Sequence, residues 1–153
     1  MALLATLDHP AGPLHVVVAC VEWEPSLADD HLAQTQALAA MATDSALDGP
    51  LPVVLTADLN APPDSPEARA LTDAMVDAWV AGGGDPAGVT LSAKNPIAPR
   101  EARRQIDRRI DYVLARSGGA GRAVSVKDVC LADAPVDGLP PSDHYAVVAD
   151  LGP

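Results

Sequence analysis

Short apolar runs alternate with turns rich in proline and glycine along most of the chain. Residues 2–8 alternate weakly between apolar and polar positions, and Leu14–Val21 is a valine-rich run, so both are expected to be strands. The turn residues Pro10 to Pro13 lie between them, which predicts a hairpin over the first twenty residues. Val53–Ala57 is a continuous short run typical of a strand that is covered on both faces.

Two segments carry signals for helices. Ser26 is a suitable cap for a helix from Leu27 to about Thr43, in which Leu27, Leu38 and Met41 share one face. Ser65, followed by Pro66 and Glu67, predicts a second helix that continues to about Val76. At least one helix therefore connects two strands.

The second half of the chain is richer in strands than in helices. Residues 82–105 are expected to be loop-like, and strands are predicted at 109–115, 124–131 and 145–151. Gly118, Gly119 and Gly121 predict a hairpin between the first two of these strands. The fold class is α/β (α+β): a layered α/β sandwich with a largely antiparallel sheet, forming a single domain over residues 1–153.

Composition narrows the class of protein. The 153 residues suffice for one domain, and a hydrophobic content of 48% is enough for a sizeable core. Neither an apolar run long enough to cross a bilayer nor a credible signal peptide is present in the sequence. Two cysteines, Cys20 and Cys130, exclude a disulfide scaffold and a cysteine zinc site, and they make a reducing, cytoplasmic location the simplest expectation.

The charge is strongly acidic but unevenly distributed. A formal net charge of −11 makes tight binding to duplex DNA unlikely, because such binding depends on many phosphate contacts. Six of the ten basic residues nevertheless fall between positions 94 and 109, among them Arg104 and Arg108. This segment is either a solvated loop tied to nearby carboxylates or a surface that faces substrate phosphate.

Three short motifs carry the candidate chemistry. Asp58 and Asn60 follow the apolar strand, where an extended chain would place them on one side, although Asp-x-Asn is also ordinary turn chemistry. Asp111 lies between apolar neighbours in a strand, so it needs a partner, either a local arginine or a histidine. Asp143 and His144 precede the last strand, where a turn with a solvated histidine is the plainer alternative.

Taken in order, these motifs resemble the endonuclease/exonuclease/phosphatase superfamily. The likeness runs from about Leu14 to Leu151, and Gly88-Val89-Thr90 adds to it. The resemblance implies a four-layered α/β sandwich and a phosphoester hydrolase, acting on a phosphorylated small molecule or a phosphodiester, that depends on a divalent metal, usually Mg²⁺ with Mn²⁺ as the other choice. A hard cation suits a site rich in Asp and Asn.

The resemblance also implies a role for each matching residue. Asp58 would align or deprotonate the attacking water, and Asn60 would hold the phosphate. Asp143 would lie in the metal site, and His144, with its ring fixed by Asp111, would contact the phosphate as a base or as a stabiliser of its charge. Arg104 and Arg108 are candidates for contacts with substrate phosphate.

Two departures from the family pattern qualify these roles. Ala19-Cys20 stands where the family usually carries Thr-His, and Cys20 is expected to be a small buried thiol rather than a nucleophile or a soft ligand. Members are also longer, with a first half that supplies an Asn and a metal-binding Glu, so the chain resembles the C-terminal portion of the fold. One sheet would then lack its cover, which predicts a homo-oligomer, in the simplest case a two-fold dimer.

Two functions follow from these features. The matching motifs favour a metal-dependent phosphoester hydrolase. The missing Glu and the cysteine at position 20 favour a non-catalytic binding or assembly module that retains the scaffold.

Overall fold

The computed structural model describes residues 1–99, 105–119 and 123–152. Its main element is a five-stranded sheet with the strand order β1-β2-β3-β5-β4. These strands are β1 (Ala2–His9), β2 (Gly12–Cys20), β3 (Val53–Asp58), β4 (Val76–Asp77) and β5 (Asp111–Arg116). A separate pair, β6 (Ser125–Ala132) and β7 (Ala146–Gly152), forms a two-stranded sheet.

Pairing in the larger sheet is mostly antiparallel, as expected. The predicted hairpin of β1 and β2 is confirmed, with Ala5 opposite Val16. The β2–β3 pair is parallel, so the chain must cross back over the sheet between them, and it does so through α1 (Ala28–Ala42). Single turns η1 (Pro25–Leu27) and η2 (Ser45–Leu47) flank that helix.

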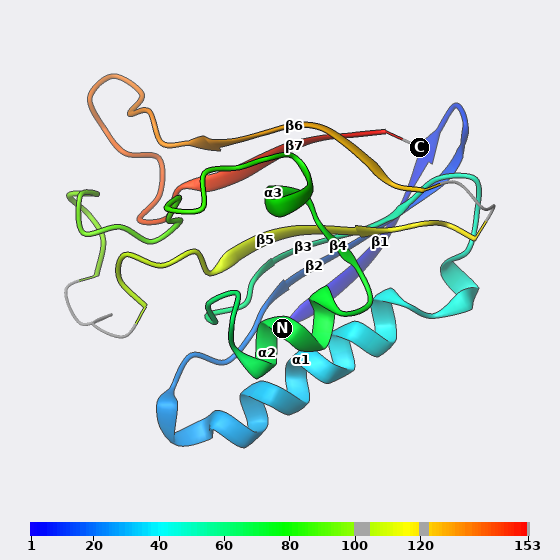
Figure 1. Ribbon diagram of the computed structural model, residues 1–153, viewed down its shortest axis with the longest axis horizontal. Helices are drawn as coiled ribbons and strands as arrows, with labels where there is room; N and C mark the ends of the chain where they lie inside the picture. Colours follow the sequence, from blue (N-terminus) through cyan, green and yellow to red (C-terminus); the bar gives the residue numbers. More distant parts are fainter. Residues whose placement is uncertain (100–104, 120–122, 153) are drawn as a thin grey trace.

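Helices α1 and α2 (Pro66–Thr72) form a layer against one face of the five-stranded sheet (Figure 1). The core between these layers is apolar and includes buried side chains from three central strands and both helices: Val17, Leu55, Tyr112, Leu114, Leu38 and Leu71. The Ser65 hydroxyl caps α2 by accepting a hydrogen bond from the Ala68 N–H. This helix is shorter than the sequence predicts, because residues 76–77 pair with β5 as strand β4.

The β6–β7 pair lies on the opposite side of the five-stranded sheet from α1 and α2 (Figure 1). The short helix α3 (Ala78–Ala81) contacts β5, β6 and β7 and so lies between the two sheets. The predicted hairpin across Gly118 to Gly121 is wrong, because β5 pairs with β3 and β4 whereas β6 pairs with β7. The chain instead changes sheet between β5 and β6, and Gly118 lies so close to Leu51 that an added Cβ would come within 2.1 Å of the Leu51 carbonyl oxygen.

Part of the sheet is left open on the β6–β7 side. Leu3, Leu7 and Val18 lie on this face of β1 and β2, and their exposed fractions are 63%, 50% and 46%. We call these three side chains the open apolar face. Within the described residues, no helix combines the length and apolar character that crossing a membrane requires.

Candidate active site

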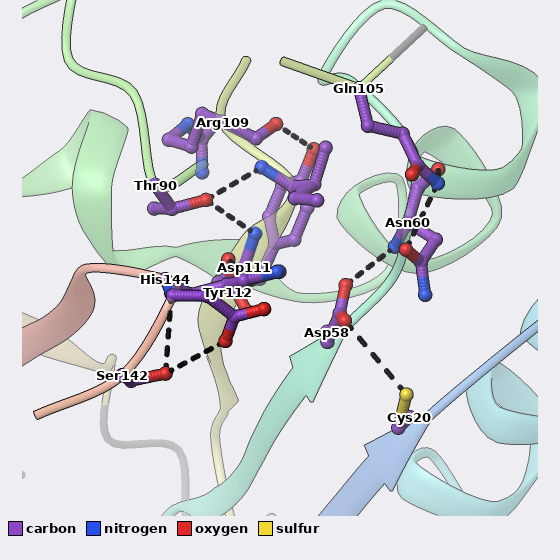
Figure 2. Close-up of polar contacts among 12 residues, drawn as sticks. Cys20, Asp58, Asn60, Thr90, Gln105, Arg109, Asp111, Tyr112, Ser142 and His144 are labelled. Carbon is purple, nitrogen blue, oxygen red and sulfur yellow. Dashed lines mark hydrogen bonds and ion pairs between the residues drawn. The ribbon is translucent and has the colours of Figure 1, made fainter. Parts of the chain in front are cut away.

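Three neighbouring strands place polar side chains in one row at one end of the sheet, where β2 and β3 end and β5 begins. Cys20 ends β2, Asp58 ends β3 and Asp111 begins β5, and the strand register sets Cys20 opposite Asp58 and Asp58 opposite Asp111. Directly opposed residues project from the same face of a sheet. The row therefore arises because β2 and β3 are parallel whereas β5 runs the other way, and Figure 2 shows its members together.

Asp58 is held by the turn that follows its strand. Its Oδ1 accepts a hydrogen bond from the Asn60 backbone N–H at 2.9 Å, and Asn60 adopts a left-handed φ of 50°, which asparagine tolerates better than most residues. The chain thus turns at Asn60 instead of remaining extended. Burial, followed by the nearby Asp111 carboxylate, raises the pKa of Asp58 above its ordinary value.

The Asn60 side chain is oriented from two directions. Its Nδ2 donates to the Val21 carbonyl at 3.1 Å, and its Oδ1 accepts from Gln105 Nε2 at 3.0 Å. These contacts fix the amide beside Asp58 and link the ends of β2 and β3. The structure thus follows the alternative of ordinary turn chemistry and not the extended arrangement, and the contact of Asn60 with phosphate stays a prediction.

Asp111 pairs with a histidine and not with a local arginine. His144 Nδ1 lies 2.9 Å from Asp111 Oδ2, and both side chains are about one-fifth exposed. The hydrogen bond to Asp111 is the main cause that raises the pKa of His144, with partial burial acting in the opposite direction. The neighbouring arginine, Arg109, is instead paired with Asp77 at 2.7 Å in a buried ion pair.

Two buried polar side chains hold the partners of this pair in place. The Thr90 hydroxyl oxygen accepts hydrogen bonds from the backbone N–H groups of Ile110 (3.0 Å) and Asp111 (3.1 Å) at the start of β5. Asn95 Nδ2 donates to the carbonyls of Ser142 and Asp143 at 2.9 and 3.0 Å, immediately before His144. The loop between α3 and β5 therefore fixes both the carboxylate and the segment that carries the imidazole.

Asp58, Asp111 and His144 can hold a metal ion together. One ligand atom from each lies within 4.8 Å of the others, and within residues 1–99, 105–119 and 123–152 this is the one such group of three or more His, Cys, Asp or Glu side chains. Two carboxylates at this spacing repel one another, and this repulsion adds to the effect of burial in raising the pKa of Asp58. A divalent cation would relieve that repulsion, so the donor set fits the metal that the sequence motifs imply.

Two other residues predicted for the site, Asp143 and Arg108, lie outside the group formed by Asp58, Asp111 and His144. Asp143 is outside this metal-compatible group, and its Oδ1 accepts from the Ser142 hydroxyl at 3.3 Å. Arg108 is exposed and lines a different cleft, of about 790 Å³, beside Pro62 and Trp79. Arg104 lies outside the described residues. The metal role of Asp143 and the phosphate roles of both arginines stay predictions.

The expectation that Cys20 is buried is wrong. The residue is exposed at the end of β2, and its thiol donates to Asp58 Oδ2 at 3.8 Å. It escapes burial because the residues of β2 alternate in direction, so that Ala19 faces the helices and Cys20 faces the row of polar side chains. Partial desolvation and the Asp58 carboxylate raise the pKa of the thiol.

A shallow cleft opens next to this row. It measures about 250 Å³ and lies between β2, β3 and β5 on one side and the start of β7 on the other, with Asp58, Asp111 and Ala146 among its lining residues. The polar row thus faces space between the two sheets.

Comparison with protein families gives a match over most of the chain. Residues 3–144 match the model described as the Endonuclease/Exonuclease/phosphatase family. The chain belongs to this family. The resemblance inferred from the sequence is therefore confirmed, and the site motifs lie within the matched range. A search of curated proteins finds no match.

Several solved structures share the fold of this chain. D. rerio TDP2, in a structure with a single-strand DNA product, is 18% identical, with a TM-score of 0.75 over 99% of this chain and 61% of that one. A protein of unknown function from Enterococcus faecalis is 19% identical (TM-score 0.72, 99% and 55% covered). The mannosyl-6-phosphatase of Bacteroides thetaiotaomicron is 14% identical (TM-score 0.63, 92% and 51% covered). The chain therefore spans between about half and three-fifths of the length of these relatives.

Sequence reasoning missed two residues that position the site. Asn95 and Gln105 lie in the segment that the sequence predicts only as loop, and each donates to backbone or side-chain groups of the candidate site. Asn95 is almost fully buried, and a buried amide needs a partner. Nothing in the local sequence distinguishes it from a solvated loop residue.

Proposed function

We propose that this member of the endonuclease/exonuclease/phosphatase family is a phosphoester hydrolase that depends on a divalent metal, with Mg²⁺ as the first choice and Mn²⁺ as the second. One observation carries the proposal. Asp58, Asp111 and His144 come from three separate segments, and their ligand atoms gather within 4.8 Å at a cleft beside the sheet edge. Such a cluster suits a reaction in which negative charge develops on phosphorus.

The raised pKa values suit the proposed roles of the two central residues. Asp58 takes the proton of the attacking water, because a carboxylate whose pKa is raised is a stronger base near neutral pH. His144 contacts the phosphate with its ring held by Asp111, and its raised pKa favours the imidazolium that stabilises added negative charge. Asn60 holds a phosphate oxygen from the turn after β3.

A metal ion would be held next to Asp58 by the Asp111 carboxylate oxygen that His144 leaves free, with Asp143 of the neighbouring turn as the ligand that the sequence motifs imply. When bound, it supplies Lewis-acid stabilisation of the phosphoryl oxygens. The chain's own part is to hold these carboxylates in place, through the Asn60 turn for Asp58 and through Thr90 for Asp111.

The substrate class that fits best is a small phosphoester. The net charge of −11 disfavours a long duplex, and the chain has only four aromatic residues, two Trp and two Tyr, for stacking on bases. Family members of the same fold include TDP2, solved with a single-strand DNA product, and a mannosyl-6-phosphatase. A phosphorylated small molecule or a short phosphodiester lies within this range.

Hydrolysis of bis-p-nitrophenyl phosphate with Mg²⁺ or Mn²⁺ tests the proposal. The wild-type chain should release p-nitrophenol, whereas Asp111→Asn and His144→Gln should lower the rate by about 100-fold or more, as expected for loss of an acid–base or charge-stabilising group. Asp150→Asn on β7 is the matched control, because this carboxylate is exposed on a strand of the other sheet. Equal background rates in all four proteins would overturn the proposal.

The second candidate is a non-catalytic binding or assembly module. The cysteine at the end of β2 favours it, because a thiol with a raised pKa cannot replace the positive charge of a histidine beside the phosphate. A module of this kind would bind a phosphoester ligand with the same residues and release no product.

We further propose that the chain forms a homodimer and works in the cytoplasm. The open apolar face (Leu3, Leu7 and Val18) includes side chains of β1, which is an edge strand of the sheet, so a second copy can cover the face and pair with the strand at once. Both cysteines are free, which agrees with a reducing compartment.

A further inference from the structure

Gln105 reaches the candidate site from the long loop between α3 and β5, 45 residues beyond Asn60 in the chain. Its Nε2 donates to two oxygens of Asn60, the side-chain Oδ1 at 3.0 Å and the backbone carbonyl at 3.4 Å (Figure 2). Both side chains are partly buried. The proposed hydrolysis gives Asn60 a contact with phosphate, but it gives Gln105 no part.

Two backbone carbonyls decide which way both side-chain amides point. A carbonyl oxygen can only accept a hydrogen bond. The Val21 carbonyl therefore requires Nδ2 of Asn60, and the Asn60 carbonyl requires Nε2 of Gln105. With both amides set in this way, Oδ1 of Asn60 accepts from Gln105, and the donors run in one direction from Gln105 through Asn60 to Val21.

This direction determines which kind of ligand Asn60 can bind. The amide nitrogen carries two protons, and Val21 accepts one of them, so the other can be donated to an oxygen of a phosphoester. Oδ1 is the atom that a hard cation such as Mg²⁺ would coordinate, and it is already used as an acceptor for Gln105. The contact with Gln105 thus favours an anion at Asn60 over a metal ion.

We propose that Gln105 is a positioning residue that holds the Asn60 amide with its second N–H group available to substrate phosphate and its oxygen withheld from the metal. This role rests on the proposed function, because it requires that Asn60 binds phosphate. Gln105 acts through Asn60 and does not itself touch the substrate. Removing its donor should therefore weaken phosphate binding only while Asn60 is present.

Binding of phenylphosphonate, an analogue that the enzyme cannot hydrolyse, tests this role in a double-mutant cycle. Gln105→Met keeps the length of the side chain but removes the donor, so the Kd measured by titration calorimetry with Mg²⁺ should rise by about fivefold. Asn60→Ala should raise the Kd by about tenfold or more, and adding Gln105→Met to it should change the Kd by less than about twofold. A merely structural role would weaken binding in both backgrounds.

Two further measurements support the cycle. Gln36→Met is the matched control, because Gln36 is an exposed glutamine of α1, and circular dichroism confirms that each variant is folded. In the ligand-free protein, the NMR signal of the Asn60 side-chain amide, identified by its absence from Asn60→Ala, should shift in Gln105→Met and stay in place in Gln36→Met.

The outcomes separate this inference from the proposed function. A loss of binding that depends on Asn60 supports the role of Gln105 even if bis-p-nitrophenyl phosphate is not hydrolysed. The role is overturned, even if hydrolysis with Mg²⁺ is found, by a wild-type chain that does not bind phenylphosphonate or by an unchanged Kd in Gln105→Met. An equal loss with and without Asn60 overturns it as well.

Discussion

Asp111 is the side chain on which the arrangement of the site depends. It accepts from His144 at 2.9 Å, faces Asp58 across the strand pair, and is itself set by the hydroxyl of Thr90. Its neighbour Arg109 is directed away from it, into the ion pair with Asp77. The negative charge of Asp111 is therefore left to act on the histidine and on any bound cation.

The pairing of His144 with Asp111 predicts how the stability of the metal-free protein changes with pH. Because the pKa of His144 is raised on folding, the protonated ring stabilises the fold fully below the unfolded pKa of about 6.5. This stabilisation is lost as the pH rises through the folded value. The difference in Tm between wild type and His144→Gln, measured with a chelator present, should thus be largest near pH 6 and should shrink toward alkaline pH. His9→Gln, at an exposed position far along the chain from the site, is the matched control.

Cys20→His tests whether the missing imidazole limits catalysis. The position ends β2 opposite Asp58, and the family usually carries a histidine there. A ring at this place can donate a hydrogen bond to the phosphate, so hydrolysis of bis-p-nitrophenyl phosphate should rise by about tenfold or more. Steady-state rates with Mg²⁺ check this, with Cys130→His as the control for an added histidine. An unchanged rate in Cys20→His would show that the thiol is not the limiting feature.

Among the elements, those predicted correctly are the ones whose signal is local. The valine-rich β2, the apolar β3 and the Ser65 cap of α2 all follow from neighbouring residues. The errors concern elements whose partner is distant in sequence. Val76 and Asp77 continue a helical pattern but pair with β5, and the glycines after β5 accompany a change of sheet instead of a hairpin.

The residues of the candidate site divide in the same way: local motifs identify some of them, and the others depend on contacts that are distant in sequence. The sequence identifies Asp58, Asp111 and His144 because each lies in a short motif next to a strand. The resemblance to the family then connects the three motifs into one site. Asn95 and Gln105 support the site from a long loop, where their role depends on contacts 45 to 48 residues away in the chain. The hydrophobic pattern of the sequence does not indicate such contacts, so only the folded structure identifies Asn95 and Gln105.

Replacing Thr90, which lies in the loop between α3 and β5, should lower the free energy of unfolding. Thr90→Val keeps the shape of the side chain but leaves the buried N–H groups of Ile110 and Asp111 without their acceptor. Each unsatisfied group costs about 1–3 kcal/mol, so the free energy of unfolding should fall by about 2–6 kcal/mol. Urea denaturation followed by circular dichroism measures this. Thr90→Ser retains the acceptor and should lose less than half as much, and equal losses would contradict the assignment.

At the scale of the whole molecule, one sheet carries three different surfaces. Its helical side is a packed core, its strand ends carry the polar row, and the face over β1 and β2 remains open and apolar. The net charge of −11 opposes contact between copies, while the apolar area favours it. The balance between these effects depends on salt.

Self-association should therefore increase with both protein concentration and ionic strength. Salt screens the repulsion between acidic copies and leaves the apolar contact unaffected, so the dimer fraction in sedimentation velocity should rise as salt is added. Leu3→Lys combined with Val18→Lys should yield monomers, because both side chains lie on the open apolar face. Val80→Lys is the control, because Val80 is an exposed apolar residue of α3 and does not belong to this face. A wild-type chain that stays monomeric at high concentration and salt would contradict the dimer.

The packing of Trp79 makes its fluorescence a probe of the local structure. Its indole is 6% exposed, donates to the Asp85 carbonyl and lies close against Gly84 and Gly88, whereas Trp23 beyond the end of β2 is 62% exposed. An aqueous quencher such as iodide should therefore extinguish the emission of Trp23 and spare that of Trp79. With Trp23 replaced by Phe, the remaining fluorescence would report on the segment around Gly84 and Gly88, which leads along the chain to Thr90.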